Sequence, residues 1–315
     1  MVQAAFFVTW MNSSNLLYVE LIEKLGMYKR PNGCRTWSNG PRQSNGTKGE
    51  SQIASHSLTV TDVLKRHPCI CLGTLWLCTQ AKATLRLKPD ARPVFRPKRP
   101  VPFAALPEVE RELDRLEQNG VISKVAHSYR AAPIVVVKKR NGCFRICVDF
   151  STGLNDALEL HQYPLPLPED IFTVLNGGTY FSGIDFADEY LQIEVDEDSR
   201  DLLTINAHRG LYRYNRLPFG VKSAPGIFQH MMDTMLAGLQ GTVAYLDDVI
   251  VVGKTMDDHQ KILDAVLNRI DEFEFTIRLE KWCFAMDRIQ YLGFVFDKSG
   301  RCPDPSKIED RRLKP

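Results

Sequence analysis

The chain has 315 residues, of which 44% are hydrophobic, so it can bury one large core or the cores of two domains. Its net charge of +2 excludes a strongly basic protein, and any sign of nucleic-acid binding must lie in the local distribution of charge. No apolar run approaches the roughly 20 residues that cross a membrane, and the first residues lack the basic region and cleavage site of a signal peptide. We therefore expect an intracellular protein without a membrane partner.

The first third of the chain changes character near residue 82. Residues 1–81 show no clear periodicity, and the Asn-, Gly-, Ser- and Lys-rich segment 29–52 predicts a disordered loop. Segment 82–102 then holds seven basic residues against one acid, Asp90, and five prolines that keep it extended. This pattern is typical of a solvated linker or of a basic strap along a phosphate backbone. Both interpretations stay open.

Helices are predicted where apolar residues recur on one face and a start or stop signal flanks them. The predicted helices follow Pro107 and stop before Gly120, lead from the proline-rich segment 163–170 to Asn176, begin at the N-cap Ser223, and run from about Asp257 to Phe273. Their lengths suit helices that pack one face on a sheet.

Strands form the second class of predicted elements. PIVVVKK and CFRICVDF flank Asn141-Gly142, which is the strongest short-range sign of a β-hairpin. This hairpin would carry Lys138, Lys139 and Arg145 at or near its tip. The last stretch, from FAMDRIQ to SGRC, predicts a further pair of strands. Hairpins mixed with helices favour an α+β fold with an antiparallel sheet.

Two aspartates interrupt an otherwise apolar strand in AYLDDVIVVG, residues 244–253. Adjacent carboxylates repel each other and are costly to bury, so a divalent cation is the natural partner of Asp247 and Asp248. Asp185, on a strand of its own, could complete a site for two metals that promote displacement at phosphorus. Lys139 and Arg145 could bind a triphosphate there. The alternatives are an ordinary turn for the aspartate pair, a turn cap for Asp185 and a solvated hairpin end for the cations.

Seven segments occur in the order found in reverse transcriptases: SYRAAPIVVVKKRNGCFRICVDF, LN, YPLPLPED, SGIDFADEYLQI, RLPFGVKSAPGIFQ, AYLDDVIVV and YLGF. Over about residues 82–310, the chain resembles the reverse transcriptase domain of gypsy-type LTR retrotransposon polyproteins. The resemblance implies an α+β right-hand polymerase, with fingers and a palm whose antiparallel sheet packs on helices, and with the thumb absent or incomplete.

The resemblance also implies a division of the chain. It leaves a divergent, partly disordered N-terminal region (1–81), the reverse transcriptase domain (82–310) and a C-terminal end (311–315). It assigns the fingers to about residues 82–162 and 193–222 and the palm to about 163–192 and 223–310. We expect this chain to correspond to part of a longer polyprotein with RNase H and integrase regions.

Carried over by motif, the resemblance assigns catalysis and metal binding to three aspartates. Asp185, Asp247 and Asp248 match the residues that hold two Mg²⁺ ions, with Mn²⁺ as a possible substitute. Lys139 and Arg145 match fingers residues that bind the incoming dNTP, and a shift of one position in the alignment would exchange Lys139 for Lys138.

Further roles implied by the resemblance surround this centre. Tyr190 matches the aromatic residue that closes off the sugar 2′ position, and Phe219 and Gly220 match residues that line the nucleotide pocket, with Gln229 as an additional candidate. The segment Tyr291, Leu292 and Gly293 resembles the hairpin that grips the primer.

One position departs from the family pattern. Glu189 stands directly before Tyr190, where relatives usually have Ala or Gly, and its charge would repel a triphosphate unless it turned outward.

Two candidate functions follow from the resemblance and from this departure. The first is an RNA-directed DNA polymerase that adds dNTPs to a primer 3′-OH on an RNA or DNA template; the second is a catalytically inactive retroelement remnant or a co-opted nucleic-acid-binding protein. The resemblance is compatible with a virus-like particle in the cytoplasm or with the nucleus, and leaves the oligomeric state open.

Overall fold

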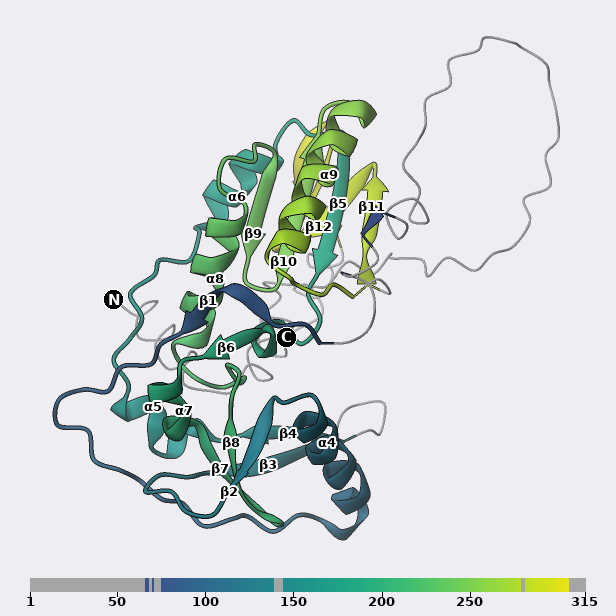
Figure 1. The fold of residues 1–315 in the computed structure, drawn as a ribbon. Helices are drawn as coiled ribbons and strands as arrows, with labels where there is room; N and C mark the ends of the chain where they lie inside the picture. The colour runs from purple at the N-terminus through teal and green to yellow at the C-terminus, as the bar shows by residue number, and fades with distance from the viewer. Residues whose placement is uncertain (1–65, 68–69, 71–74, 139–143, 279–280, 306–315) are drawn as a thin grey trace, which may run out of the picture.

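The computed structural model describes residues 66–67, 70, 75–138, 144–278 and 281–305 (Figure 1). Its strands are β1 (Cys78–Ala83), β2 (Ile122–Val125), β3 (Ala132–Lys138), β4 (Phe144–Val148), β5 (Tyr180–Asp185), β6 (Ile193–Val195), β7 (Thr204–Ala207), β8 (Gly210–Tyr214), β9 (Thr242–Tyr245), β10 (Asp248–Gly253), β11 (Cys283–Met286), β12 (Arg288–Tyr291), β13 (Phe294–Asp297) and β14 (Gly300–Pro303).

The helices are α4 (Leu106–Gln118), α5 (Leu154–Ala157), α6 (Pro168–Leu175), α7 (Glu197–Arg200), α8 (Ala224–Met235) and α9 (Met256–Glu272), with the 3-10 turns η2 (Phe103–Ala105), η3 (Phe150–Thr152), η4 (Glu189–Gln192) and η5 (Asp201–Leu203). Among the helices of the described residues, none is long and apolar enough to cross a lipid bilayer.

A five-stranded sheet with the order β2-β8-β7-β3-β4 forms one end of the molecule, beside α4 (Figure 1). The predicted helix after Pro107 is confirmed as α4, which buries Val109, Leu113 and Leu116. The predicted strands on either side of Asn141-Gly142 are confirmed as β3 and β4. Residues 139–143, which include Lys139, lie outside the described part of the chain.

A four-stranded sheet with the order β11-β5-β10-β9 forms the other end (Figure 1). Every pairing in it is antiparallel. Helix α9 packs on β10 and β5, while α6 and α8 pack on β9. The expectation of an α+β fold with an antiparallel sheet packed on helices is therefore confirmed.

The C-terminal stretch is more elaborate than the predicted pair of strands. It forms β11, which joins the four-stranded sheet, and a separate three-stranded antiparallel sheet of β12, β13 and β14. Leu292 and Gly293 both have positive φ, as in the tight turns that join hairpins, and Asp297 accepts a hydrogen bond from the backbone N–H of Ser299 at the next turn. These two turns fold one predicted segment into three strands.

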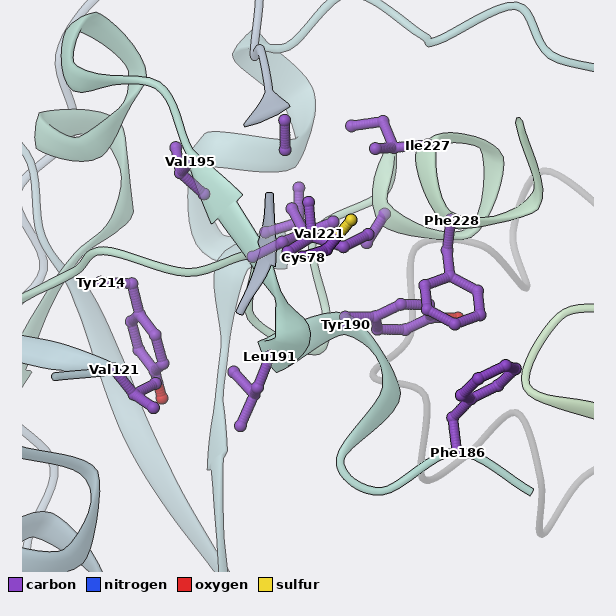
Figure 2. Packing of buried hydrophobic residues seen from close by; sticks show 14 of the residues in the cluster. Cys78, Val121, Phe186, Tyr190, Leu191, Val195, Tyr214, Val221, Ile227 and Phe228 are labelled. Atoms are coloured by element: carbon purple, nitrogen blue, oxygen red, sulfur yellow. The ribbon is translucent and has the colours of Figure 1, made fainter. Parts of the chain in front are cut away.

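One apolar cluster joins the two ends of the molecule. Side chains from both sheets and from the central pair β1 and β6 meet in it, and Figure 2 shows the part of this cluster around Tyr190. Tyr190 packs edge-on against Phe228, with ring centroids 5.3 Å apart, and Phe228 in turn packs against Phe186. Because such interiors are densely packed, the two sheets are held in a fixed relation.

Two local expectations need correction or refinement. Ser223 stands at the N-cap of α8, but its backbone is already helical and its hydroxyl donates to the carbonyl oxygen of Glu159, so it does not cap the helix.

The basic segment 82–102 is not a free linker. Arg99 pairs with Asp149, and Arg96 donates to the Thr152 carbonyl oxygen. Its proposed contact with a phosphate backbone stays a prediction.

Candidate active site

The site is built on the hairpin of β9 and β10. Asp248 pairs with Tyr245 across this hairpin, so Leu246 and Asp247 form a two-residue turn. Leu246 has a φ of 55°, a conformation that favours glycine and is strained for a side chain such as leucine. The turn places the Asp247 and Asp248 carboxylates at the end of the sheet.

Asp185 reaches the same place from the neighbouring strand. It is the last residue of β5 and is the direct antiparallel partner of Asp248. The carboxylates of Asp185, Asp247 and Asp248 each offer an oxygen within 4.8 Å of the others. Asp185 is only 8% exposed. Hard divalent cations prefer such oxygen ligands, so these three residues could hold a metal ion.

A buried glutamine side chain holds the strained turn in place through hydrogen bonds to the backbone of Leu246 and Ala244. Gln229 of α8 is fully buried, and its side-chain oxygen accepts a hydrogen bond of 2.9 Å from the backbone N–H of Leu246. Its amide nitrogen donates to the carbonyl oxygen of Ala244 and to Asp233. Gln229 therefore positions the turn that carries the aspartates.

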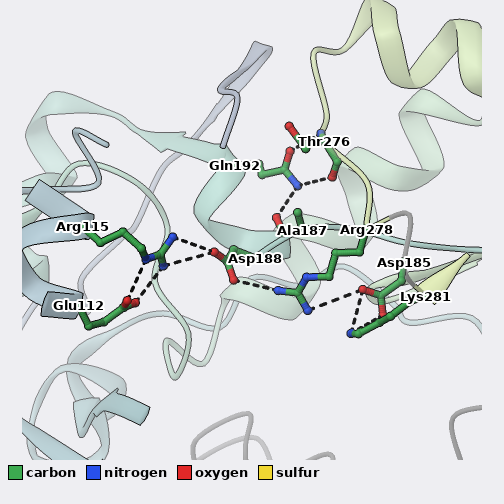
Figure 3. Close-up of polar contacts among 9 residues, drawn as sticks. All are labelled: Glu112, Arg115, Asp185, Ala187, Asp188, Gln192, Thr276, Arg278 and Lys281. Carbon is green, nitrogen blue, oxygen red and sulfur yellow. Dashed lines mark hydrogen bonds and ion pairs between the residues drawn. The ribbon is translucent and has the colours of Figure 1, made fainter. Parts of the chain in front are cut away.

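Two cations from the segment before β11 lie against Asp185 (Figure 3). The Lys281 ammonium donates to both carboxylate oxygens of Asp185, at 3.1 and 3.0 Å. Arg278 has one nitrogen 3.8 Å from Asp185, and another donates to Asp188 at 2.9 Å. These positive charges offset part of the repulsion among the aspartates.

The ion pairs continue from Asp188 to the other sheet (Figure 3). Asp188, which has a positive φ of 49°, also accepts from Arg115 of α4, and Arg115 is held by Glu112 one turn earlier. Gln192 supports the same loop: its amide nitrogen donates to the carbonyl oxygens of Ala187 and Thr276. The loop after Asp185 is therefore tied to both ends of the molecule.

Glu189 lies close enough to this centre to sense its charge. Burial raises the pKa of Glu189 well above its ordinary value, and the carboxylates of Asp247 and Asp185 raise it further, while Arg278 and Arg145 act in the opposite direction. The side chain is partly buried. The carboxyl group of Glu189 therefore interacts with the aspartate cluster, and this interaction favours its protonated form.

The residues expected at a nucleotide pocket gather beside Glu189. The Arg145 guanidinium lies over the Phe219 ring, 5.2 Å from its centroid, and Phe219 packs against Tyr190. Tyr190 is only 3% exposed. Lys138, on β3, lies near the ring of Phe144. The structure brings Arg145, Phe219 and Tyr190 together, and their contacts with a nucleotide stay predictions.

The Phe219–Gly220 loop is held by a side chain that received no role in the sequence analysis. The amide nitrogen of Asn155 donates to the Gly220 carbonyl oxygen, and its oxygen accepts from the backbone N–H of Lys222. Gly220 has a φ of 90°, and a Cβ there would lie 3.2 Å from the Val148 carbonyl oxygen. Both constraints fix the path of the loop beside Arg145.

The last residue of β12, Tyr291, lies close enough to Asp248 for the charge of that carboxylate to affect its hydroxyl, and it begins the turn that joins β12 to β13. This turn consists of Leu292 and Gly293 between the paired residues Tyr291 and Phe294. Burial, followed by the charge of Asp248, raises the pKa of the Tyr291 hydroxyl. The segment expected to grip a primer thus lies near the aspartate cluster.

Comparison with known proteins identifies the family. The model of the family described as reverse transcriptase (RNA-dependent DNA polymerase) matches residues 136–296. The chain belongs to this reverse transcriptase family. It is 46% identical over 237 residues to the Caenorhabditis elegans protein K02A2.6, covering 75% of this chain and 18% of that protein.

Retrotransposon proteins are among the relatives of this reverse transcriptase domain. Two are retrovirus-related Pol polyproteins of Drosophila melanogaster: that of transposon 412 is 32% identical, covering 72% of this chain and 19% of the relative, and that of transposon gypsy is 30% identical, covering 73% and 23%. The chain thus spans less than a quarter of the length of these relatives. The expected relation to gypsy-type elements is confirmed.

Solved structures with the same fold come from foamy virus. The protease-reverse transcriptase in complex with double-stranded DNA superposes with a TM-score of 0.69 at 21% identity, covering 85% of this chain and 51% of that one. The same viral protein with an RNA/DNA hybrid also gives 0.69, at 20% identity, covering 85% and 40%. The predicted right-hand polymerase fold of fingers and palm is confirmed.

The sequence did not indicate the cations that surround the aspartates of this reverse transcriptase domain, and it offered Gln229 as a candidate for the nucleotide pocket, whereas the structure places its side chain on the backbone of the aspartate turn. Lys281 is 96 positions from Asp185, and no local pattern connects them. The acids in DFADEY were the one available sign, because several carboxylates in a short loop need basic partners. That sign indicates a partner but does not say which residue supplies it.

Replacing Gln229 should loosen the turn that carries the aspartates. In Gln229→Leu, the buried N–H of Leu246 and carbonyl of Ala244 would lose their partner, so we expect the free energy of unfolding to fall by about 1–3 kcal/mol. Urea denaturation would measure this loss, with Thr234→Ala on the exposed face of the same helix as control. Equal stabilities of the two variants would contradict the role assigned to Gln229.

Proposed function

We propose that this domain is an active RNA-directed DNA polymerase, which adds dNTPs to a primer 3′-OH. The observation that carries the proposal is the meeting of Asp185 with Asp247 and Asp248 through the pairing of β5 and β10. The donor set consists of carboxylate oxygens, which fits Mg²⁺ and also Mn²⁺. Two such ions, when bound, would activate the attacking hydroxyl and stabilise the leaving pyrophosphate.

The surrounding residues would bind and orient the substrates. Arg145, with Lys139 or Lys138, would bind the triphosphate, since a guanidinium matches phosphate oxygens in pairs and an ammonium acts as a point charge. Tyr190, supported by Phe219, would form the wall beside the sugar 2′ position. Gly220 would let the backbone approach the nucleotide closely.

The nucleic-acid partner is inferred from the same site. The foamy virus relatives were solved with double-stranded DNA and with an RNA/DNA hybrid, which supports an RNA or DNA template with a primer as the substrate here. The turn of Leu292 and Gly293 would hold the primer end near Asp248. The relatives named as Pol polyproteins support a longer polyprotein, for which we propose RNase H and integrase regions and action in a cytoplasmic virus-like particle or in the nucleus.

A primer-extension assay on an RNA template with Mg²⁺ tests the proposal. We expect wild-type protein to incorporate dNTPs and the double variant Asp247→Ala/Asp248→Ala to lose at least about 10³-fold in rate, because metal-ion catalysis supplies several kcal/mol. Asp287→Ala is the matched control, since the Asp287 side chain is 83% exposed and lies outside the cluster. Equal incorporation by the wild type and the double variant would refute the catalytic assignment.

A second candidate function is favoured by Glu189. Glu189 adds a further carboxyl group beside Asp247 and Asp185, and at a pH above its raised pKa its negative charge would oppose binding of a triphosphate near the cluster. The chain would then be a retroelement remnant or a co-opted protein that binds nucleic acid without catalysis.

Replacing Glu189 separates the two candidates. If the polymerase is active, Glu189→Ala should lower the KM for dNTP several-fold at a pH above the raised pKa of Glu189, where the ionised carboxylate repels the triphosphate, while Glu169→Ala on the exposed face of α6 should not. Steady-state primer extension at varied dNTP concentration measures this. An inactive wild type that gains activity in Glu189→Ala would favour the non-catalytic candidate, and an unchanged KM would remove the role assigned to Glu189.

A further inference from the structure

Two cations, Lys281 and Arg278, lie against the Asp185 carboxylate. The Lys281 ammonium bonds to both of its carboxylate oxygens, and Arg278 lies 3.8 Å from one of them (Figure 3). The Asp185 side chain is 11% exposed and that of Lys281 is 28% exposed. Lys281 therefore contacts both oxygens of the Asp185 carboxylate, and the Lys281 side chain remains partly exposed to solvent.

The two cations are held in different ways. Arg278 is fixed through its backbone, whose N–H donates to the Asp185 carbonyl oxygen at 2.8 Å, and through its guanidinium, which Asp188 shares. Asp188 is in turn tied to Arg115. The backbone N–H of Lys281 donates to the Arg278 carbonyl oxygen at 3.1 Å, and its ammonium reaches the Asp185 carboxylate at the end of a flexible four-carbon stem. Lys281 can therefore leave Asp185 without disturbing the ion pairs of Asp188.

A divalent ion and this ammonium would compete for one carboxylate. Mg²⁺ binds carboxylate oxygens at about 2.0–2.1 Å, which is closer than the ammonium, and carries twice its charge. Two cations bound to the same carboxylate repel each other strongly in a site that is partly shielded from water. The weaker and more mobile of the two is the one that leaves.

We propose that Lys281 is the exchangeable counter-ion of the metal site. Binding of a divalent cation to Asp185 displaces the Lys281 ammonium, while Arg278 stays in place through Asp188. Lys281 thereby keeps the Asp185 carboxylate aligned before the metal arrives and lowers the affinity of the site for metal. This inference rests on the proposed metal role of Asp185.

Competitive acetylation of lysines tests the displacement directly. The full chain, freed of metal with a chelator, would be labelled with and without Mg²⁺, and the acetylation of each lysine measured by mass spectrometry. We expect Mg²⁺ to raise the acetylation rate of Lys281 by about fivefold or more, the lower end of typical coupling between two binding events. Lys124, which pairs with Glu117 away from the site, serves as the internal control and should not change.

Metal affinity gives a second measurement. Electron paramagnetic resonance of free Mn²⁺ should show that Lys281→Gln binds Mn²⁺ about fivefold more tightly than wild type, and that Arg278→Gln gains clearly less. Metal binding with unchanged labelling of Lys281, or equal gains in the two variants, would overturn the exchange while leaving the metal site intact. Absence of Mn²⁺ binding in every variant would instead overturn the metal role of Asp185 and the exchange with it.

Discussion

The pairing of Asp248 with Asp185 across β10 and β5 is the constraint on which the rest of the site depends. It brings three carboxylates within reach of one ion, and it does so at the edge of an apolar core, where like charges are costly. The strained Leu246 turn and its buried partner Gln229 follow from the same requirement, because the third carboxylate must be held at a fixed place beside the first two.

Basic residues beside this pairing offset part of the negative charge of the aspartates. Arg278 and Lys281 lie on Asp185, and Asp188 passes the ionic connection on to Arg115 in α4. Apolar packing around Tyr190 (Figure 2) and this chain of ion pairs (Figure 3) therefore both join the two ends of the molecule. The site therefore lies where both ends of the molecule contribute residues, which is the arrangement that the proposed polymerase activity requires.

The sequence predicted those elements whose signals lie within a short stretch of the chain. Helix α4 follows from its apolar stripe, β3 and β4 follow from Asn141-Gly142, and the interrupted apolar run marks Asp247 and Asp248. The nearness of Asp185 could not be derived from spacing, because strand pairing is a tertiary property, and it entered through family resemblance. Which cation pairs with Asp185, and that β12 to β14 form a sheet of their own, could not be predicted, since a cation far along the chain and the choice of sheet both depend on packing.

The central claim is that Asp185, Asp247 and Asp248 form one metal centre. Anomalous diffraction from crystals soaked in Mn²⁺ tests it most directly, because manganese scatters anomalously and needs no assay of activity. The account predicts a peak within coordination distance of oxygens from Asp185 and from at least one residue of the Asp247–Asp248 pair. Manganese bound only elsewhere, or no peak at these carboxylates at saturating Mn²⁺, would contradict it.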